Sequence, residues 1–237
     1  MEKLGPLVAS SGAVKVLIDH HLDPEAFCDY KFSFSDSCAT CELVFHFITR
    51  LEGTNSVSKD VAVCLYTGIM TDTGSFRFSS MTSDTHRVIA SLIDAGASNY
   101  TIHEAIYDNF SERRTRFLGF CLSEKLVVLD EYRTAYISVK QNELRKFDHQ
   151  SGDTEGIVNY ALGIKGIRLA AFFCEQDGLI KISFRSKDGF SVKELAAAHF
   201  SGGGHTYAAG GRSHESLEST VNRFLFLLPG LSAKLLN

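Results

Sequence analysis

Hydrophobic residues follow one another from residue 13 to residue 18 (AVKVLI), interrupted only by Lys15, and this pattern predicts a buried strand of a parallel sheet. In the segments that follow, apolar residues recur three and four positions apart instead. This helical spacing is found in residues 37–53, residues 58–70 and residues 82–97. The first half of the chain is therefore expected to combine a strand with several amphipathic helices.

Polar residues and glycines stand at the expected ends of these helices. Ser37 and Ser58 precede two of the periodic segments, where a serine oxygen can accept a hydrogen bond from the first turn. Gly53 and Gly96 follow the last periodic residues, as glycine does at many helix ends. We expect the two serines to cap helices and the two glycines to end them.

The second half of the chain mixes strands with helices. Residues 99–124 have a helical pattern with an interruption at residues 109–111, and a dense cluster of Glu and Arg predicts a connection between domains there. The other expected elements are strands at residues 125–130 and 134–139, a helix at 153–163, a hairpin at 167–187 that turns at Gln176, Asp177 and Gly178, and a helix at 191–200. The chain as a whole is expected to be an α/β protein.

Composition narrows the classes of ligand. The 237 residues include 44% hydrophobic residues, which suffices for one large or two small domains, and the net charge of −4 argues against a broad basic face for long duplex DNA. Short anionic ligands stay open. The six cysteines lie mostly in apolar segments, so we expect a reducing, cytoplasmic environment. No apolar run approaches the roughly 18 residues that span a bilayer, so no membrane insertion is expected.

The most distinctive polar residues come directly after the first strand. Asp19, His20 and His21 follow Ile18, at the edge of the sheet where open α/β proteins bind ligands. Imidazole and carboxylate together suit Zn²⁺ or Mn²⁺, and Asp19 could instead fix the tautomer of a neighbouring histidine. The alternative is a polar strand end with two exposed histidines.

A second candidate is Asp72, in the segment GIMTDTGSF, residues 68–76. Here a helical apolar run leads into a turn of small residues, where a metal or a phosphate can approach the backbone closely. A carboxylate that caps the next element would have the same pattern. Asp72, Thr73 and Gly74 also match the signature of aspartic proteases, but those enzymes need a second such carboxylate and the chain has no second copy.

Near the carboxyl end, Gly202, Gly203 and Gly204 precede His205 in the segment FSGGGHTYAAGG. Successive glycines let backbone N–H groups converge on an anion, and a helix that starts just beyond them would add its dipole. This arrangement predicts a phosphate cradle, with an ordinary flexible loop as the alternative.

A basic residue ends the predicted hairpin. Arg185, with Ser186 beside it, is placed to hold a phosphate through two parallel hydrogen bonds, or else it is one more solvated arginine. The pair Cys38 and Cys41 lies one helical turn apart without a second pair, which favours packing over zinc binding or redox chemistry. No ligand spacing is found for the remaining histidines, His46, His86, His103, His149, His199 and His214.

Taken in order, LIDHH, GIMTDTGSF, SFRSK and SGGGH resemble the DHH/DHHA1 phosphoesterase superfamily, and within it the branch of bifunctional oligoribonucleases and 3′-phosphoadenosine 5′-phosphate (PAP) phosphatases, often described as exopolyphosphatase-related. The resemblance runs from about residue 13 to about residue 212. It implies a parallel-sheet DHH domain at residues 1–110, incomplete at its amino end, a helical connection at 111–125, and a smaller mixed α/β DHHA1 domain for substrate binding at 126–237.

The resemblance also implies roles for the candidate residues. His20 and Asp72 would bind catalytic metals, His21 would contact the substrate phosphate, and Asp19 would support them from behind. In the second domain, Arg185 and His205 would contact a substrate phosphate, with Ser186 beside Arg185. Gly202, Gly203 and Gly204 would shape the adjoining loop, where the family often has a fourth glycine in place of Ser201.

Two motifs of the family are missing from this chain. Members carry an HxDxD motif and a metal-bridging aspartate before the DHH triplet, but residues 1–18 contain only Glu2 as an acid and no histidine. We therefore expect Met1 to correspond to an internal position of a longer protein. Such a chain would bind Mn²⁺ weakly and have negligible activity, whereas a version extended to include HxDxD would be active.

The expected function is hydrolysis of short oligoribonucleotides, of PAP, or of both, with two Mn²⁺ ions for which Mg²⁺ or Co²⁺ could substitute. The competing class is a non-catalytic module that binds short nucleotides. Hydrolysis of a cyclic dinucleotide or of polyphosphate is a weaker alternative. The expected partner is a short RNA or nucleotide, and the sequence is compatible with a homodimer without fixing the oligomeric state.

Overall fold

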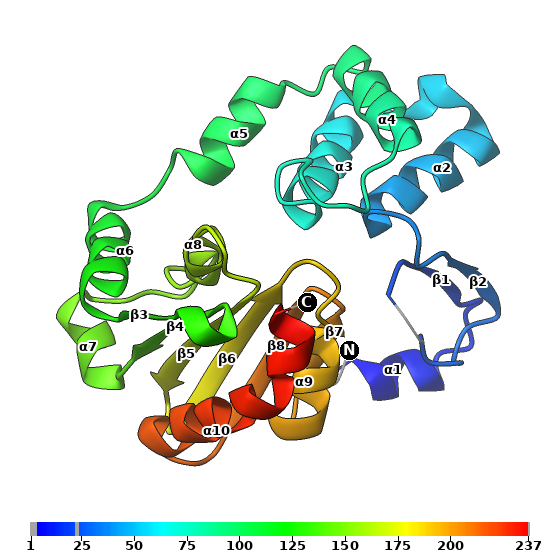
Figure 1. Cartoon of the computed structure of the whole chain (residues 1–237). Helices are drawn as coiled ribbons and strands as arrows, with labels where there is room; N and C mark the ends of the chain where they lie inside the picture. The colour runs from blue at the N-terminus through cyan, green and yellow to red at the C-terminus, as the bar shows by residue number, and fades with distance from the viewer. Residues whose placement is uncertain (1–3, 22–23, 237) are drawn as a thin grey trace. The chain divides into compact units, whose positions relative to one another are not determined.

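The computed structural model describes residues 4–21 and 24–236 (Figure 1). The chain divides into two compact units, Met1–Asn109 and Phe110–Asn237. In the described part of the chain, no helix combines the length and the apolar character that crossing a bilayer requires.

The first unit contains one small parallel sheet and a group of helices. Strand β1 (Val16–Asp19) pairs in parallel with β2 (Tyr30–Ser33), which places Asp19 opposite Ser33 at the carboxyl end of the sheet. The predicted strand is confirmed, whereas β2 was not predicted. The helices of this unit are α1 (Gly5–Ser10), α2 (Thr40–Glu52), α3 (Lys59–Asp72), α4 (Ser83–Asp94) and α5 (Asn99–Tyr107), with a short 3₁₀ turn η1 (Thr54–Ser56).

The helix ends follow most of the sequence signals. Ser58 caps α3 by accepting a hydrogen bond from the backbone N–H of Val61, and Gly53 ends α2 with a positive φ of 86°. The predicted cap at Ser37 is wrong, because the residue that precedes α2 is Ala39. The Ser37 hydroxyl lies 2.6 Å from Glu42 Oε2 and donates to that carboxylate instead. A serine near a helix start thus holds a side chain within the first turn.

Apolar faces of α2 to α5 form the core of the first unit. Ile69 and Met70 of α3 are fully buried, and they pack in one cluster with residues of α2 and α4 such as Phe45 and Leu92. This burial fixes the position of the last turn of α3, and therefore of Asp72 at its end. Packing of an amphipathic face, rather than helix propensity alone, holds such a short helix in place.

The second unit is built on a six-stranded sheet with the strand order β3-β4-β5-β6-β8-β7. Strands β4 and β5 are parallel, and every other neighbouring pair is antiparallel. The strands are β3 (Leu126–Leu129), β4 (Thr134–Val139), β5 (Leu169–Gln176), β6 (Leu179–Ser186), β7 (Gly203–His205) and β8 (Ala208–Ser213). The helices are α6 (Glu112–Glu124), α7 (Gln141–Lys146), α8 (Ile157–Leu162), α9 (Val192–His199) and α10 (Leu217–Leu236), with a 3₁₀ turn η2 (Asp130–Tyr132).

Strands β5 and β6 form the predicted hairpin. They are joined by Asp177 and Gly178, whose φ angles are 54° and 74°. Two successive positive φ values define the tight turn that matches the twist of the two strands, and a glycine adopts this conformation without steric cost. The sequence signal of Asp followed by Gly therefore predicted both the turn and its position.

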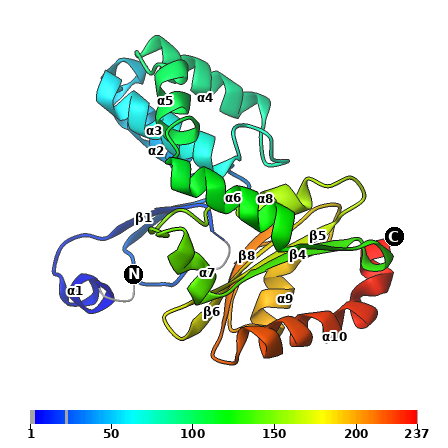
Figure 2. The ribbon, with the colours of Figure 1, turned by 90° about the vertical axis from the view of Figure 1, so that its left-hand side faces the viewer.

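Helices cover both faces of this sheet (Figures 1 and 2). On one face, α9 and α10 pack over buried residues that include Phe173 and Phe184. On the other, α6 and α8 pack over a separate cluster that includes Phe172. Phe117 of α6 is buried in this second cluster, so the segment interpreted from sequence as a connection contributes to the core of the second unit.

Candidate functional site

The DHH triplet lies at the carboxyl end of β1, where Asp19 organises the turn that follows. Its Oδ1 atom accepts hydrogen bonds from the backbone N–H groups of His20 (2.9 Å) and His21 (3.2 Å) and from Nδ1 of His21 (2.7 Å). Burial alone would raise the pKa of Asp19, but these hydrogen bonds and the nearby imidazole outweigh it, and the pKa lies below its ordinary value. Asp19 is therefore an ionised carboxylate that orients His21.

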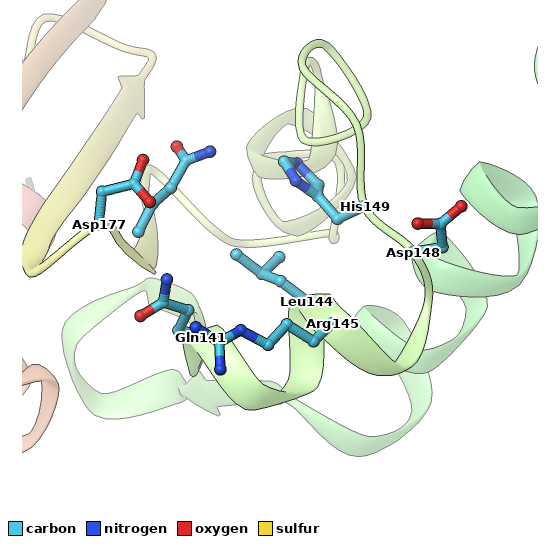
Figure 3. Close-up of a pocket in the computed structure, with 7 residues that line it drawn as sticks. Gln141, Leu144, Arg145, Asp148, His149 and Asp177 are labelled. Carbon is cyan, nitrogen blue, oxygen red and sulfur yellow. The ribbon is translucent and has the colours of Figure 1, made fainter.

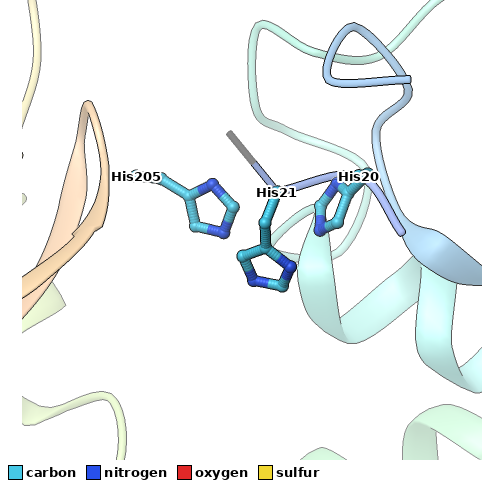
Figure 4. Close-up of side chains that lie close together, drawn as sticks. All are labelled: His20, His21 and His205. Atoms are coloured by element: carbon cyan, nitrogen blue, oxygen red, sulfur yellow. The ribbon is translucent and has the colours of Figure 1, made fainter. Parts of the chain in front are cut away.

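His20 points into the protein and meets Asp72. Its Nε2 atom lies 3.1 Å from Asp72 Oδ2, and its Nδ1 atom lies 3.2 Å from the backbone oxygen of Ser37. His20 is buried, with 8% of its surface exposed, whereas His21 is exposed beside it, and the two rings meet edge to face at 5.0 Å (Figure 4). Two distant segments of sequence thus bring an imidazole and a carboxylate together within the first unit.

This geometry fits a divalent cation. A carbonyl oxygen can only accept, so the His20 hydrogen bond to Ser37 places a proton on Nδ1. In the neutral imidazole, Nε2 then carries a lone pair that faces the lone pairs of Asp72. Two acceptors at this distance attract a cation, and imidazole nitrogen with carboxylate oxygen is a donor set that Mn²⁺ or Zn²⁺ accepts.

In the second unit, strand register brings Arg185 and His205 into one row. Ala208 of β8 pairs with Arg185 of β6 on one side and with His205 of β7 on the other. Residues directly opposite each other point to the same face, and neighbouring strands are about 4.8 Å apart, so the outer two Cα atoms are separated by roughly 10 Å. A small residue, Ala208, lies between them. The long Arg185 side chain can reach a group bound beside His205.

The row continues over a polar face that strand register also defines. We call it the β6–β8–β7 face, and it consists of Lys181, Ser183, Arg185, Ala208, Gly210, Arg212, Gly203 and His205. Sequence analysis missed Lys181 and Arg212, which are direct neighbours across β6 and β8. Alternation in FRSK and GGRS hinted at their orientation, but the pairing of the two strands was needed to place them together. A space of about 390 Å³ adjoins this face, lined by Ser201, Gly202, Gly203, Gly210, Gly211 and Arg212.

The glycine run forms a hairpin strand, so the predicted helix start after it is wrong. A Cβ atom on Gly202 would lie 2.0 Å from the backbone oxygen of Gly210, and one on Gly204 would lie 2.6 Å from that of Ala208. These glycines are required because β7 approaches β8 so closely. Gly203 meets nothing within 4 Å and is exposed. The preceding Ser201 has a φ of 45°, a conformation in which glycine would be less strained.

Arg185 and Ser186 point to opposite faces of the sheet, as successive strand residues do. Ser186 is buried, and its hydroxyl donates to the backbone oxygen of Phe190 at 2.6 Å. Arg185 Nη1 donates to the backbone oxygen of Phe184 at 2.9 Å. Burial lowers the pKa of Arg185, and the charge of Glu155 opposes this shift. A partly desolvated guanidinium gains more from an anionic partner than a solvated one does.

Another hollow of about 260 Å³ lies in the second unit at a distance in sequence from all predicted site residues (Figure 3). Its lining residues are Gln141, Leu144, Arg145, Asp148, His149, Gln176 and Asp177. Both charge signs are present, and Asp148 is already 3.8 Å from Arg113. The lining therefore has no consistent preference for an anion.

A further group of ligand-type side chains lies in the first unit. Side-chain atoms of Glu42, His46 and Asp84 all lie within 4.8 Å of one another, so the expectation that His46 has no ligand-type neighbours is wrong. The spacing of Glu42 and His46, one helical turn apart, was the available signal. Glu42 Oε2 accepts hydrogen bonds from Ser37 and Cys38, and Oε1 accepts from Thr85 at 2.6 Å.

Comparison with known proteins agrees with the two-unit architecture. Residues 6–69 match the DHH family, N-terminal domain, and residues 132–228 match the DHHA1 domain. The matched ranges include the DHH triplet in the first unit and the β5–β6 hairpin with the glycine run in the second.

Several related proteins are similar over most of the chain. The bifunctional oligoribonuclease and PAP phosphatase NrnA of Bacillus subtilis is 30% identical over 203 residues, which is 84% of this chain and 63% of that protein. The protein of the same name from Thermus thermophilus is 28% identical over 81% of this chain and 56% of its own length. The crystal structure of an exopolyphosphatase-related protein from Bacteroides fragilis is 38% identical, with a TM-score of 0.95, and covers 100% of this chain and 69% of that one.

The chain thus spans less than two thirds of the length of the curated relatives named above. Both domain matches, the order of their motifs and the similarity to these proteins agree with one another. The chain belongs to the DHH/DHHA1 family.

Proposed function

We propose that this chain is part of a metal-dependent phosphoesterase that hydrolyses short oligoribonucleotides, PAP, or both. The observation that carries this proposal is the approach of His20 Nε2 to Asp72 Oδ2 at 3.1 Å at the end of the DHH strand. The printed names of the NrnA relatives support the choice of substrate class. Family membership supports phosphoester hydrolysis as the reaction.

Mn²⁺ is the proposed cofactor, with Mg²⁺ and Co²⁺ as substitutes. A set of imidazole nitrogen and carboxylate oxygen donors favours a transition metal over Ca²⁺. When bound, divalent cations would supply Lewis acidity that activates water and neutralises charge on the phosphoryl group. His20 and Asp72 are the residues of this chain that would hold them.

The neighbouring residues position the substrate. Asp19 accepts a hydrogen bond from His21 Nδ1 and thereby holds the His21 ring in one orientation. With Nδ1 engaged, the opposite edge of this exposed ring is the one that contacts a substrate phosphate. Asp19 has no proton to give, because its pKa lies below the ordinary value for a carboxyl group; burial opposes this shift, but the hydrogen bonds from His21 outweigh it.

In the second unit, the β6–β8–β7 face would bind the phosphates of the nucleotide. Arg185 and His205 lie in one row, and Ser186 remains a predicted neighbour although its hydroxyl is engaged with Phe190. Lys181 and Arg212 add two cations next to glycine backbone. Several cations on one face suit a ligand with more than one phosphate, such as a short RNA or a bisphosphate nucleotide.

The cysteines support a cytoplasmic location as part of this proposal. All six are free thiols, in keeping with a reducing environment. A homodimer stays a hypothesis that the present observations do not address.

The proposal is tested by assaying the natural protein that contains this sequence, alongside the 237-residue chain, with Mn²⁺. RNAs of two to five nucleotides, PAP, a cyclic dinucleotide and polyphosphate are compared as substrates. We expect Mn²⁺-dependent release of mononucleotides or of phosphate from PAP, lost in the His20→Ala variant. Faster cleavage of polyphosphate or of the cyclic dinucleotide would contradict the substrate class. Tight binding of short RNA by the natural protein without cleavage would favour a binding module instead.

A further inference from the structure

Glu42 occupies an unusual position for a carboxylate, because it is buried and yet fully hydrogen-bonded. Only 6% of its surface is exposed. Its Oε2 atom accepts from Ser37 Oγ at 2.6 Å and from the backbone N–H of Cys38 at 3.1 Å, and its Oε1 atom accepts from Thr85 Oγ1 at 2.6 Å. A buried carboxylate with three donors is ionised and rigidly held.

The hydrogen bond to Cys38 involves the same peptide group that holds His20. The N–H of Cys38 and the carbonyl of Ser37 belong to one planar peptide unit. The N–H end donates to Glu42, and the carbonyl end accepts from His20 Nδ1 at 3.2 Å. A charge at the N–H end polarises the peptide and makes its carbonyl oxygen a stronger acceptor.

Each step of this chain of contacts has a direct consequence for the ring. A stronger acceptor at Ser37 favours the His20 tautomer with its proton on Nδ1. That tautomer directs the Nε2 lone pair toward Asp72, 3.1 Å away. The hydroxyl of Ser37, which also donates to Glu42, prevents the peptide from turning away.

We propose that Glu42 is a positioning residue for His20: through the Ser37–Cys38 peptide, its charge sets the tautomer and orientation of the imidazole. For metal affinity this inference rests on the proposed function, whereas the effect on the tautomer does not. Carboxylates that act on ligating histidines are a general feature of metal sites, and here a peptide group lies between the two side chains.

The first experiment measures the His20 tautomer without metal. Histidine labelled with ¹⁵N is incorporated, the His20 signals are assigned by their loss in His20→Gln, and the imidazole nitrogen shifts are recorded at alkaline pH. In Glu42→Gln, we expect the fraction of His20 protonated on Nδ1 to fall relative to the unsubstituted protein. Glu52→Gln is the matched control, since it removes the same charge at the exposed end of the same helix.

The second experiment measures Mn²⁺ affinity by calorimetry. We expect Glu42→Gln to weaken binding by about tenfold, the lower end of effects seen when the partner of a ligating group is removed, and Glu52→Gln to leave it unchanged. An unaltered tautomer in Glu42→Gln would overturn the positioning role even if Mn²⁺ still binds. A shifted tautomer in a protein that never binds Mn²⁺ would support the positioning role and contradict the proposed function.

A second pair of variants covers the case in which Glu42→Gln does not fold. Ser37→Ala loosens the peptide on the His20 side of the carboxylate, whereas Thr85→Val removes the hydrogen bond at its other oxygen. The proposal requires the tautomer to shift in Ser37→Ala and to stay unchanged in Thr85→Val. Equal shifts in both would show a general loss of packing and would overturn it.

Discussion

The two candidate sites of this molecule are built in opposite ways. At the end of β1, polar side chains hold one another: Asp19 binds His21, and His20 lies between Ser37 and Asp72. On the β6–β8–β7 face, the missing side chains of Gly202 and Gly204 allow two backbones to approach closely.

This difference decides which substitutions each site tolerates. The first site should respond to changes of charge or hydrogen bonding that leave the volume constant. The second should respond to a single added carbon at the crowded glycines and should be insensitive to one at an open glycine. Each of the following predictions tests one side of this comparison.

The largest effect is expected for Asp72→Asn. The change removes the carboxylate that faces His20 Nε2 while keeping its size, so we expect Mn²⁺ affinity to fall by roughly 100-fold or more, above the effects of groups that support a metal ligand only indirectly. Asp60→Asn at the exposed start of the same helix is the control. Calorimetric titration checks the prediction, and equal affinities for the two variants would rule out Asp72 as a ligand.

The next effect concerns stability rather than charge. In Gly202→Ala, the added Cβ would lie 2.0 Å from a backbone oxygen that no side-chain rotation can move, and we expect the free energy of unfolding to fall by about 2–3 kcal/mol. Gly203→Ala places the same carbon in open space and should change it by less than about 0.5 kcal/mol. Urea denaturation measures both, and similar losses would contradict the close-approach explanation.

A smaller effect is expected at Arg185. Its replacement by Ala should weaken binding of a nucleotide with a terminal phosphate by about 2 kcal/mol, because a charge-assisted hydrogen bond is lost. Binding of the matching nucleoside without that phosphate should hardly change. Arg116→Ala, an exposed arginine on α6, serves as the control. If nucleotide and nucleoside lose affinity equally, Arg185 supports the fold or the base instead.

The smallest effect is a pH dependence in the first unit. Burial alone would raise the pKa of Glu42, but hydrogen bonds from Ser37, Thr85 and Cys38 outweigh it, and the pKa lies below the ordinary 4.5. The unfolded chain therefore binds this proton more readily, so the stabilisation is complete above pH 4.5 and is lost as the pH falls through the folded-state value. Urea unfolding at a series of acidic pH values should show a shallower slope for Glu42→Gln, and an unchanged slope would exclude Glu42 as its source.

Local signals in the sequence predicted much of the fold. Ser58 and Gly53 bound helices as expected, and Asp177 with Gly178 forms the expected turn, because each of these conformations is decided within a few residues. Ser37 was misinterpreted because its hydroxyl has a stronger acceptor in Glu42 than in the helix backbone. A cap and a competing contact look the same in sequence.

The sites depend on longer-range information. The approach of His20 to Asp72 follows from helix packing, and only the resemblance to a family suggested it in advance. Lys181 and Arg212 become neighbours through strand register, which the sequence does not display. The strands β7 and β8 were missed because a run of glycines and alanines lacks the alternation of apolar and polar side chains that signals a strand.

The sheet order of the second unit also has a consequence for how the β6–β8–β7 face comes into being. Strands β5 and β6 are joined by two residues, so closing their hairpin costs little chain entropy. Strand β8 reaches β6 only after residues 187–207 have folded back, which makes its pairing a slower, non-local event. During refolding, Arg185 should therefore enter a hairpin early and gain Ala208 and His205 as neighbours late. The capacity to bind phosphate should appear near the end of folding, after most of the secondary structure has formed.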